Sequence, residues 1–229
     1  MRRAFSPLTW LPILLLAPPA PAVIVDRIAI VVGDKIVTQS ELEDRIRLSA
    51  FQNHAPLDLS PASRKMAAQE LIDQKLIERE MDVGRYPRLD DAGRKTLLSD
   101  YEKAEKSDAG TLTKALAMYG LTPGDLEDDL GRQSDLLTFL NLRFRPAVEV
   151  TDQDIQKYYN ENILKGENRA GDEAQARSLN EMRAAIEQKL TGQRADRELD
   201  LWLHDQRKRT KIVYLETDLA PDKVEPAKP

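Results

Sequence analysis

Residues 23–38, VIVDRIAIVVGDKIVT, decide the fold of this chain. Two mostly apolar, β-branched runs flank a two-residue turn that contains glycine, and this pattern predicts a β-hairpin. An isolated hairpin is marginally stable in water, so a third strand is needed. The matching run, KIVYL at residues 211–215, lies near the other end of the chain. We therefore expect a small antiparallel sheet in which strand 211–215 lies beside the hairpin and brings the two ends together.

Helical signals fill the sequence between these strands. Thr38-x-x-Glu41 has the spacing of a capping box, and Ser60-Pro61 is a cap followed by proline at the first helical position. We predict helices over residues 38–52, 60–81, 90–106, 109–119, 122–145, 151–162 and 173–209, the last with a kink at Thr191-Gly192. The fold class is thus mainly α, with a small antiparallel sheet. We expect residues 216–229, with three prolines and many charges, to be disordered.

The first 22 residues predict a cleavable secretory signal. Arg2 and Arg3 precede an apolar stretch, Leu8 to Ala17, which is too short to span a bilayer as a helix. Ala20-Pro21-Ala22 then supplies small residues for cleavage after Ala22. The two arginines also resemble a twin-arginine signal, so the sequence does not choose between the two export routes. We expect the protein to work outside the cytoplasm.

Composition narrows the class of partner. The chain has no cysteine, so neither a disulfide nor a lipid anchor on an N-terminal cysteine is expected. Removing the two arginines of the leader from the 34 basic residues leaves 32 against 39 acidic ones, a formal charge of −7. That balance argues against nucleic acid as a partner. No later apolar run has the length of a membrane span, so we expect no stable membrane insertion.

The sequence predicts no catalytic, cofactor-binding or metal-binding residues. Phosphate-binding, dinucleotide-binding and esterase motifs are missing. His54 and His204 stand without other metal-ligand residues in a recognisable spacing, and we expect both at the surface. We interpret the acidic run at Asp125 and 127–129 as carboxylates that offset a helix dipole, and the basic run 207–209 as a solvated helix end.

Motifs in a specific order resemble the SurA family of periplasmic chaperones. They are residues 25–34 with 36–42, 71–77, 119–122 with Leu126, 143–146 followed by 150–159, 202–207 and 212–215. The resemblance implies a chaperone domain over residues 23–162, completed by the helix and strand of residues 173–215. Members of that family usually carry a parvulin-type prolyl isomerase domain between these parts. Here the interval is a short linker, residues 163–172, so we expect the isomerase domain to be absent.

The resemblance implies an ATP-independent holdase in the periplasm, which binds unfolded outer-membrane or exported polypeptides. Two alternatives remain open: a prolyl isomerase of the same family, and a docking protein that binds no unfolded client. Flexible or aromatic side chains near the ends of helices are the candidates for a client cradle. They are Met66, Met118, Tyr119, Phe139, Phe144, Tyr158 and Tyr159.

Overall fold

The computed structural model describes residues 26–164 and 178–221. The chain is mainly helical and carries a small three-stranded antiparallel sheet, as the sequence predicted. The predicted signal segment 1–22, with its cleavage point, and residues 165–172 of the expected linker lie outside the described residues.

The sheet joins the two ends of the described chain. Its strands are β1 (Ile28–Val32), β2 (Lys35–Thr38) and β3 (Ile212–Tyr214), in the order β2-β1-β3. Both neighbours are antiparallel to β1, and Val31 is paired with Ile36 on one side and Val213 on the other. Gly33 adopts a φ of 62° in the turn, and its N–H donates to the carbonyl of Lys211 at 2.9 Å. The predicted pairing of strand 211–215 with the hairpin is therefore confirmed.

The helices begin where the capping signals place them. Their bounds are α1 Gln39–Gln52, α2 Pro61–Gly84, α3 Asp91–Ala104, α4 Ala109–Ala117, α5 Pro123–Arg143, α6 Asp152–Tyr158 and α8 Leu179–Arg209. Thr38, Ser60, Thr122 and Thr151 each accept a backbone N–H of the first turn. A 3₁₀ turn, Arg145–Ala147, follows α5, and a π-helical turn, Tyr159–Leu164, extends α6. This turn corrects the start of the expected linker 163–172, because Ile163 and Leu164 belong to the turn and pack against the cluster between α6 and α8.

The helix α2 differs from the expected length, and α8 differs from the expected kinked shape. The helix α2 continues to Gly84, about one turn beyond the end expected near Met81, and ends on Arg85 in the left-handed conformation, with φ 52°. The helix α8 continues through Thr191-Gly192, where a kink was expected. A helix of its length extends about 46 Å, which is enough to contact two separate parts of the molecule.

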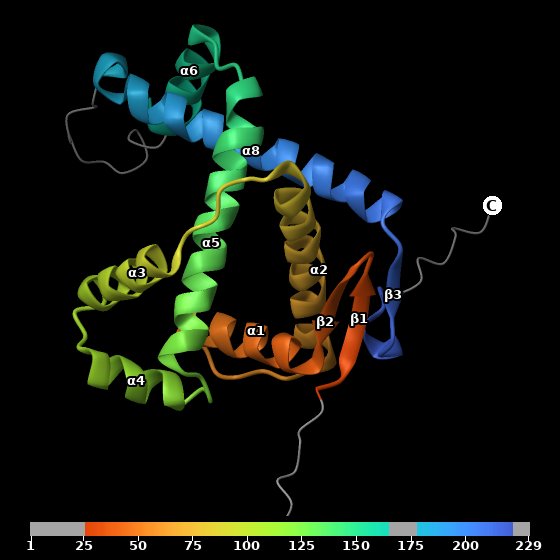
Figure 1. The fold of residues 1–229 in the computed structure, drawn as a ribbon. Coiled ribbons are helices and arrows are strands. Elements are labelled where there is room, and N and C mark those ends of the chain that lie inside the picture. The colour runs from red at the N-terminus through yellow and green to blue at the C-terminus, as the bar shows by residue number, and fades with distance from the viewer. Residues whose placement is uncertain (1–25, 165–177, 222–229) are drawn as a thin grey trace, which may run out of the picture.

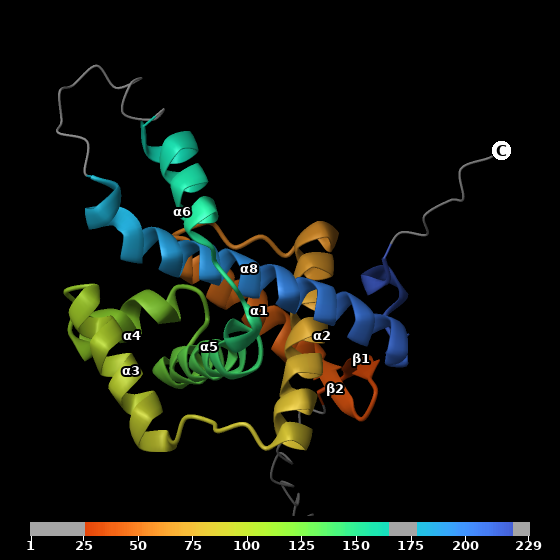
Figure 2. The same ribbon diagram turned by 90° about the horizontal axis from the view of Figure 1, so that it is seen from above.

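The helices surround a central pair. In Figure 1, α5 and α2 lie side by side, α1 crosses their lower ends, and α8 crosses their upper ends. Figure 2 shows α8 extended across the molecule, with α3 and α4 at the lower left and the sheet at the lower right. In the described ranges, no helix has both the length and the apolar character that a membrane span requires.

Within the described part of the chain, buried side chains form four clusters instead of one continuous core. The sheet, α1 and α2 share the first cluster, and α2, α5 and α8 share the second. The helices α1, α4 and α5 share the third. The fourth joins α6 to the N-terminal half of α8, where Asp154 caps α6 and lies 2.7 Å from Arg194. The hydrogen bonds from Thr151, followed by the contact with Arg194, lower the pKa of Asp154 to about 2.

The segment after β3 corrects one expectation. Residues 216–221 were expected to belong to a disordered tail, but they form a 3₁₀ turn, Thr217–Leu219, on the core. Leu219 is fully buried in the first cluster, and Glu216 lies 2.6 Å from Arg64 of α2. The prediction of disorder rested on the average composition of residues 216–229, which does not show that the single residue Leu219 packs in the core. Residues 222–229 lie outside the described chain.

We predict that Leu219→Ala lowers the free energy of unfolding by about 2–5 kcal/mol, because it leaves a cavity against the sheet. Leu215→Ala is the matched control, because Leu215 is 55% exposed in the same segment, and it should cost less than about 0.5 kcal/mol. Urea unfolding followed by circular dichroism measures both. Equal losses would contradict the docking of this turn.

Candidate functional site

An open pocket lies between α2, α5 and α8. Its volume is about 290 Å³, and its apolar wall consists of Ile77, Met81, Leu136, Leu199 and Leu203. Ile77 and Met81 come from α2, Leu136 from α5, and the other two from α8, so three helices supply the wall. These residues belong to or pack against the second cluster. The pocket therefore exposes part of an otherwise buried apolar core to solvent.

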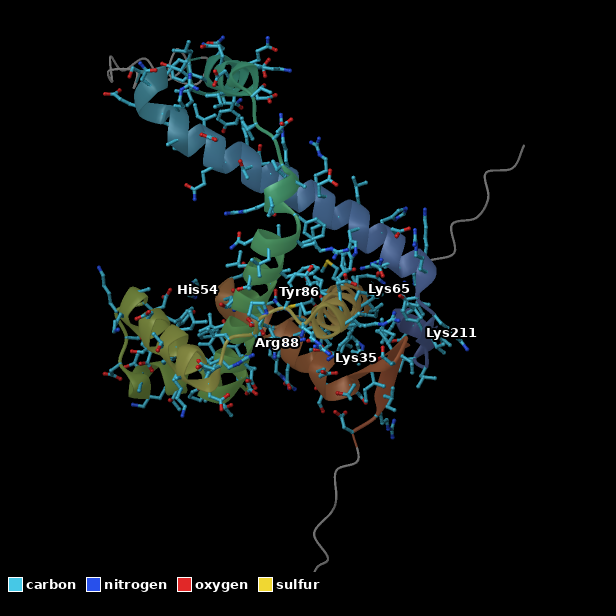
Figure 3. The ribbon with its side chains drawn as sticks, turned by 45° about the horizontal axis from the view of Figure 1, so that its top comes forward. Lys35, His54, Lys65, Tyr86, Arg88 and Lys211 are labelled. Atoms are coloured by element: carbon cyan, nitrogen blue, oxygen red, sulfur yellow. The ribbon has the colours of Figure 1, made fainter. Side chains whose placement is uncertain are left out.

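Arg88 closes one end of this pocket. Its guanidinium donates to Asp82 of α2 at 2.7 Å and lies 3.8 Å from Asp135 of α5. Figure 3 shows Tyr86 and Arg88 between α5 and α2, on the segment that follows α2. Asp82 also accepts from Lys35 at 2.8 Å, and this hydrogen bond is the main reason why its pKa lies below the usual range. The end of the pocket is thus fixed by ion pairs.

Arg45 closes the opposite end, where α1 passes beneath α2 and α5. Its guanidinium lies 3.1 Å from Asp129 of α5 and 3.1 Å from Glu70 of α2. Asp129 is 1% exposed and also accepts from Gln52 and Gln133, both at 2.8 Å. One buried carboxylate therefore joins α1 to α5 through several donors, and Arg45 extends the connection to α2.

The position of Asp129 corrects the sequence interpretation. The run 125–129 was expected to offset the helix dipole, and Asp125 does so, because it forms a capping box with Thr122. Asp129 instead points into the protein and holds helices together. In the basic run 207–209, Lys208 and Arg209 are exposed at the end of α8, as expected, whereas Arg207 is half-buried and lies 2.6 Å from Asp73 of α2. The hydrogen bond to Asp73 raises the pKa of Arg207.

A second pocket adjoins the first across Arg45 and Glu70. It has a volume of about 160 Å³ and lies between the end of α1, the loop that follows, and the start of α2, with Met66 among its lining residues. Both pockets have Arg45 and Glu70 in their linings. We call the two pockets together the α2 groove, because one face of α2 from Met66 to Met81 runs along both.

An aromatic cluster joins α5 to α8 and belongs to the same buried cluster as the wall of the larger pocket. Phe139 is fully buried, and its ring makes edge-on contacts with Tyr86, Phe144 and Trp202 at centroid distances of 5.1–5.6 Å. The guanidinium of Arg143 lies 5.5–5.9 Å from the rings of Phe139, Phe144 and Trp202. This packing fixes α5 against α8, so the wall of the larger pocket is held in place.

The structure places one of the seven cradle candidates in the groove. Met66 is 61% exposed and lines the smaller pocket. Phe139 and Phe144 lie in the aromatic cluster and do not line either pocket of the groove. These two residues support the site and do not form its surface.

The other four candidates lie elsewhere. Met118 is 79% exposed at the end of α4, and Tyr119 packs edge-on against Phe51 in the third cluster. Tyr158 and Tyr159 belong to the cluster between α6 and α8. The seven residues therefore do not converge on a single surface.

The sequence contained a partial signal for the apolar wall. Leu199 and Leu203 fall on the apolar stripe of the last helix, and Ile77 and Met81 are one helical turn apart at the end of α2. Such spacing marks an apolar face, but it does not tell whether a neighbouring helix covers that face. The sequence does not distinguish Leu136 from its neighbour Leu137, because both are leucines in the same apolar run. In the structure, Leu136 lines the larger pocket, whereas Leu137 is 58% exposed and lines neither pocket.

The histidines lie at the surface, as expected. His54 adopts a φ of 49° in the turn after α1, and His204 lies on the exposed side of α8. Within residues 26–164 and 178–221, no group of three histidine, cysteine or carboxylate side chains is arranged to hold a metal ion. The lining of the α2 groove combines apolar surface with charge pairs. Such a lining suits binding of a polypeptide or another partly apolar molecule.

Comparison with protein-family models finds no match to this chain, and comparison with curated proteins finds no significantly similar sequence. The resemblance to the SurA family stays a prediction from the motifs.

We predict that Asp129→Asn lowers the free energy of unfolding by about 1–3 kcal/mol, because the amide cannot accept from all the donors that face it. Asp128→Asn serves as the control, since Asp128 is exposed, and it should change stability by less than about 0.5 kcal/mol. Urea unfolding of both variants is the measurement. A small loss for Asp129→Asn would refute its role as the buried link between α1 and α5.

Proposed function

We propose that this protein is an ATP-independent holdase, which binds unfolded outer-membrane or other exported polypeptides in the periplasm. The observation that carries the proposal is the α2 groove, where apolar side chains from α2, α5 and α8 line an open pocket of about 290 Å³. A volume of this order receives one large or two smaller apolar side chains. The order of the family-like motifs along the sequence supports the same function.

The proposed mechanism is mass action. A holdase binds the unfolded state reversibly and thereby lowers the concentration of chains that are free to aggregate. Transmembrane β-strands alternate apolar and polar residues, so an unfolded barrel protein offers short apolar faces that suit such a pocket. Release needs no chemical step, because the client leaves when a more stable state becomes available. The excess of acidic residues keeps a protein with an open apolar groove soluble.

We predict that the purified protein suppresses aggregation of a denatured porin-like protein after dilution from urea, without nucleotide. Light scattering measures the effect over a range of molar ratios. Suppression close to equimolar amounts is the expected result. No suppression at several-fold molar excess would contradict the proposal and favour the alternative of a docking protein.

A pair of neighbouring leucines tests whether the groove is responsible. Leu136 lines the groove, whereas Leu137 is exposed outside it. We predict that Leu136→Glu raises the amount of protein needed for suppression by about fivefold or more, because a carboxylate disfavours burial of an apolar side chain. Leu137→Glu should leave it unchanged. Circular dichroism checks that both variants are folded, and equal activity of the two variants would argue against the groove.

Refolding kinetics distinguish a prolyl isomerase from a holdase. A prolyl isomerase accelerates a proline-limited refolding step at substoichiometric concentration, whereas a holdase does not. We expect no acceleration from this protein. Acceleration at a small molar fraction would overturn the assignment as a holdase alone.

A further inference from the structure

We infer that the α2 groove selects extended segments in which a lysine or arginine lies between two apolar anchor residues, about two residues from one and four from the other. This inference rests on the proposed holdase function and specifies the client segment. Its basis is the exposed carboxylate of Glu70, which stands at the boundary between the two apolar pockets.

The spacing follows from the geometry of α2. Met66 lies four residues before Glu70, which is about 6 Å along a helix axis. Ile77 and Met81 lie about 10 and 16 Å beyond Glu70 on the same scale. An extended chain advances about 3.3 Å per residue, so the smaller pocket lies about two residues from Glu70 and the larger one about four.

The alternation of side chains fits this spacing. In an extended chain, residues separated by an even number of positions point to the same side. Residues i, i+2 and i+6 therefore all face the groove when the chain runs along α2. Residue i enters the pocket at Met66, residue i+2 faces Glu70, and residue i+6 enters the pocket at Ile77 and Met81. A chain that runs in the opposite direction presents the same three residues in reverse order.

The charge at the boundary favours a cation. Glu70 and Arg45 form an ion pair at 3.1 Å, but their exposure is unequal: the side chain of Glu70 is 59% exposed and that of Arg45 is 22% exposed. Arg45 also contacts Asp129, whose side chain is 2% exposed. Glu70 is thus the more exposed member of this ion pair. A polypeptide bound along the groove therefore contacts the carboxylate of Glu70 more readily than the guanidinium of Arg45.

Acidic residues outnumber basic ones in the groove lining. The charged residues that line the two pockets comprise three arginines and six carboxylates: Arg45, Arg88, Arg132, Asp58, Glu70, Asp73, Glu78, Asp129 and Asp135. Three of these carboxylates, Asp73, Glu78 and Asp135, are balanced by cations from outside the lining, which are Arg207, Lys75 and Arg94. Asp58, at the entrance of the smaller pocket, accepts from Ser60 and Ser63. The excess of negative charge therefore lies at the smaller pocket, whose lining has Asp58 and Glu70 against Arg45, and it favours a cationic residue beside Glu70.

Synthetic peptides test this inference directly. The first peptide has leucine at i and i+6 with lysine at i+2, in a serine and glycine background. The second replaces that lysine with glutamate, and the third moves the leucines to adjacent positions. A fourth carries the first pattern in reverse order. Fluorescence anisotropy with a neutral label measures binding to the full chain at low and high salt.

We expect the lysine peptide, in one of the two directions, to bind about two- to fivefold more tightly than its glutamate counterpart at low salt. High salt should remove most of this difference, because exposed charges are screened. The peptide with adjacent leucines should bind about tenfold or more weakly, because it can fill only one pocket.

Charge variants connect the preference to Glu70. Glu70→Gln should abolish the preference for lysine, and Glu70→Lys should reverse it. Glu187→Lys is the control, because it makes the same charge change at an exposed position of α8 whose neighbour Ile186 packs in the cluster with α6. It should keep the preference. The aggregation assay is run on the same variants, and Glu70→Gln should still suppress aggregation.

The outcomes separate this inference from the function that it specifies. Equal binding of the lysine and glutamate peptides, or a preference unaffected by Glu70→Lys, would overturn the inference even where aggregation is suppressed. Absence of peptide binding together with dimer formation in sedimentation equilibrium would also overturn it, because a second copy would then occupy the groove. Charge-dependent peptide binding without suppression of aggregation would support the groove preference and reject the holdase function.

Discussion

The hydrogen bonds that β1 forms on both sides are the constraint on which the rest of the fold depends. One neighbour, β2, follows it directly, and the other, β3, comes from the far end of the described chain. Because β3 follows α8 after a short connection, this pairing fixes the C-terminal end of α8 beside the sheet and α2. Arg207 and Leu219 hold the same junction through α2 and the first cluster. The α8 wall of the groove therefore depends on strand pairing at a distance.

The groove stays open because the position of α5 relative to α2 and α8 is fixed by contacts outside the pockets. The buried carboxylates of Asp129 and Asp135 attach α5 to α1, to α3 and to the segment after α2. These contacts fix α5 through directed hydrogen bonds at its lower and middle parts. The aromatic cluster around Phe139 then fixes it against α8. Between these attachments, the mostly buried apolar side chains of α2 and α5 leave an open pocket, because neither helix is free to close over the other.

This construction is consistent with the proposed transient capture of unfolded chains. Met66 stands 61% exposed at one end of the groove face of α2, and its flexible side chain adapts to different shapes. Because neither pocket holds more than one large or two smaller apolar side chains, the proposal implies weak individual contacts and fast release. Paired charges surround both pockets and keep the apolar surface small. These properties favour a protein that delays aggregation and does not compete with the final folded state of its client.

The sequence by itself determined most of the elements and their termini, because capping residues such as Thr38 and Ser60 and the strand patterns act locally. It also determined the closure of the sheet, since β-branched runs at both ends need a partner. Only the tertiary structure decided the site. Whether Leu136 or Leu137 faces a pocket, and whether Asp129 meets water or Arg45, depends on which helix lies opposite. Composition and periodicity describe one segment at a time, whereas burial results from how separate segments pack.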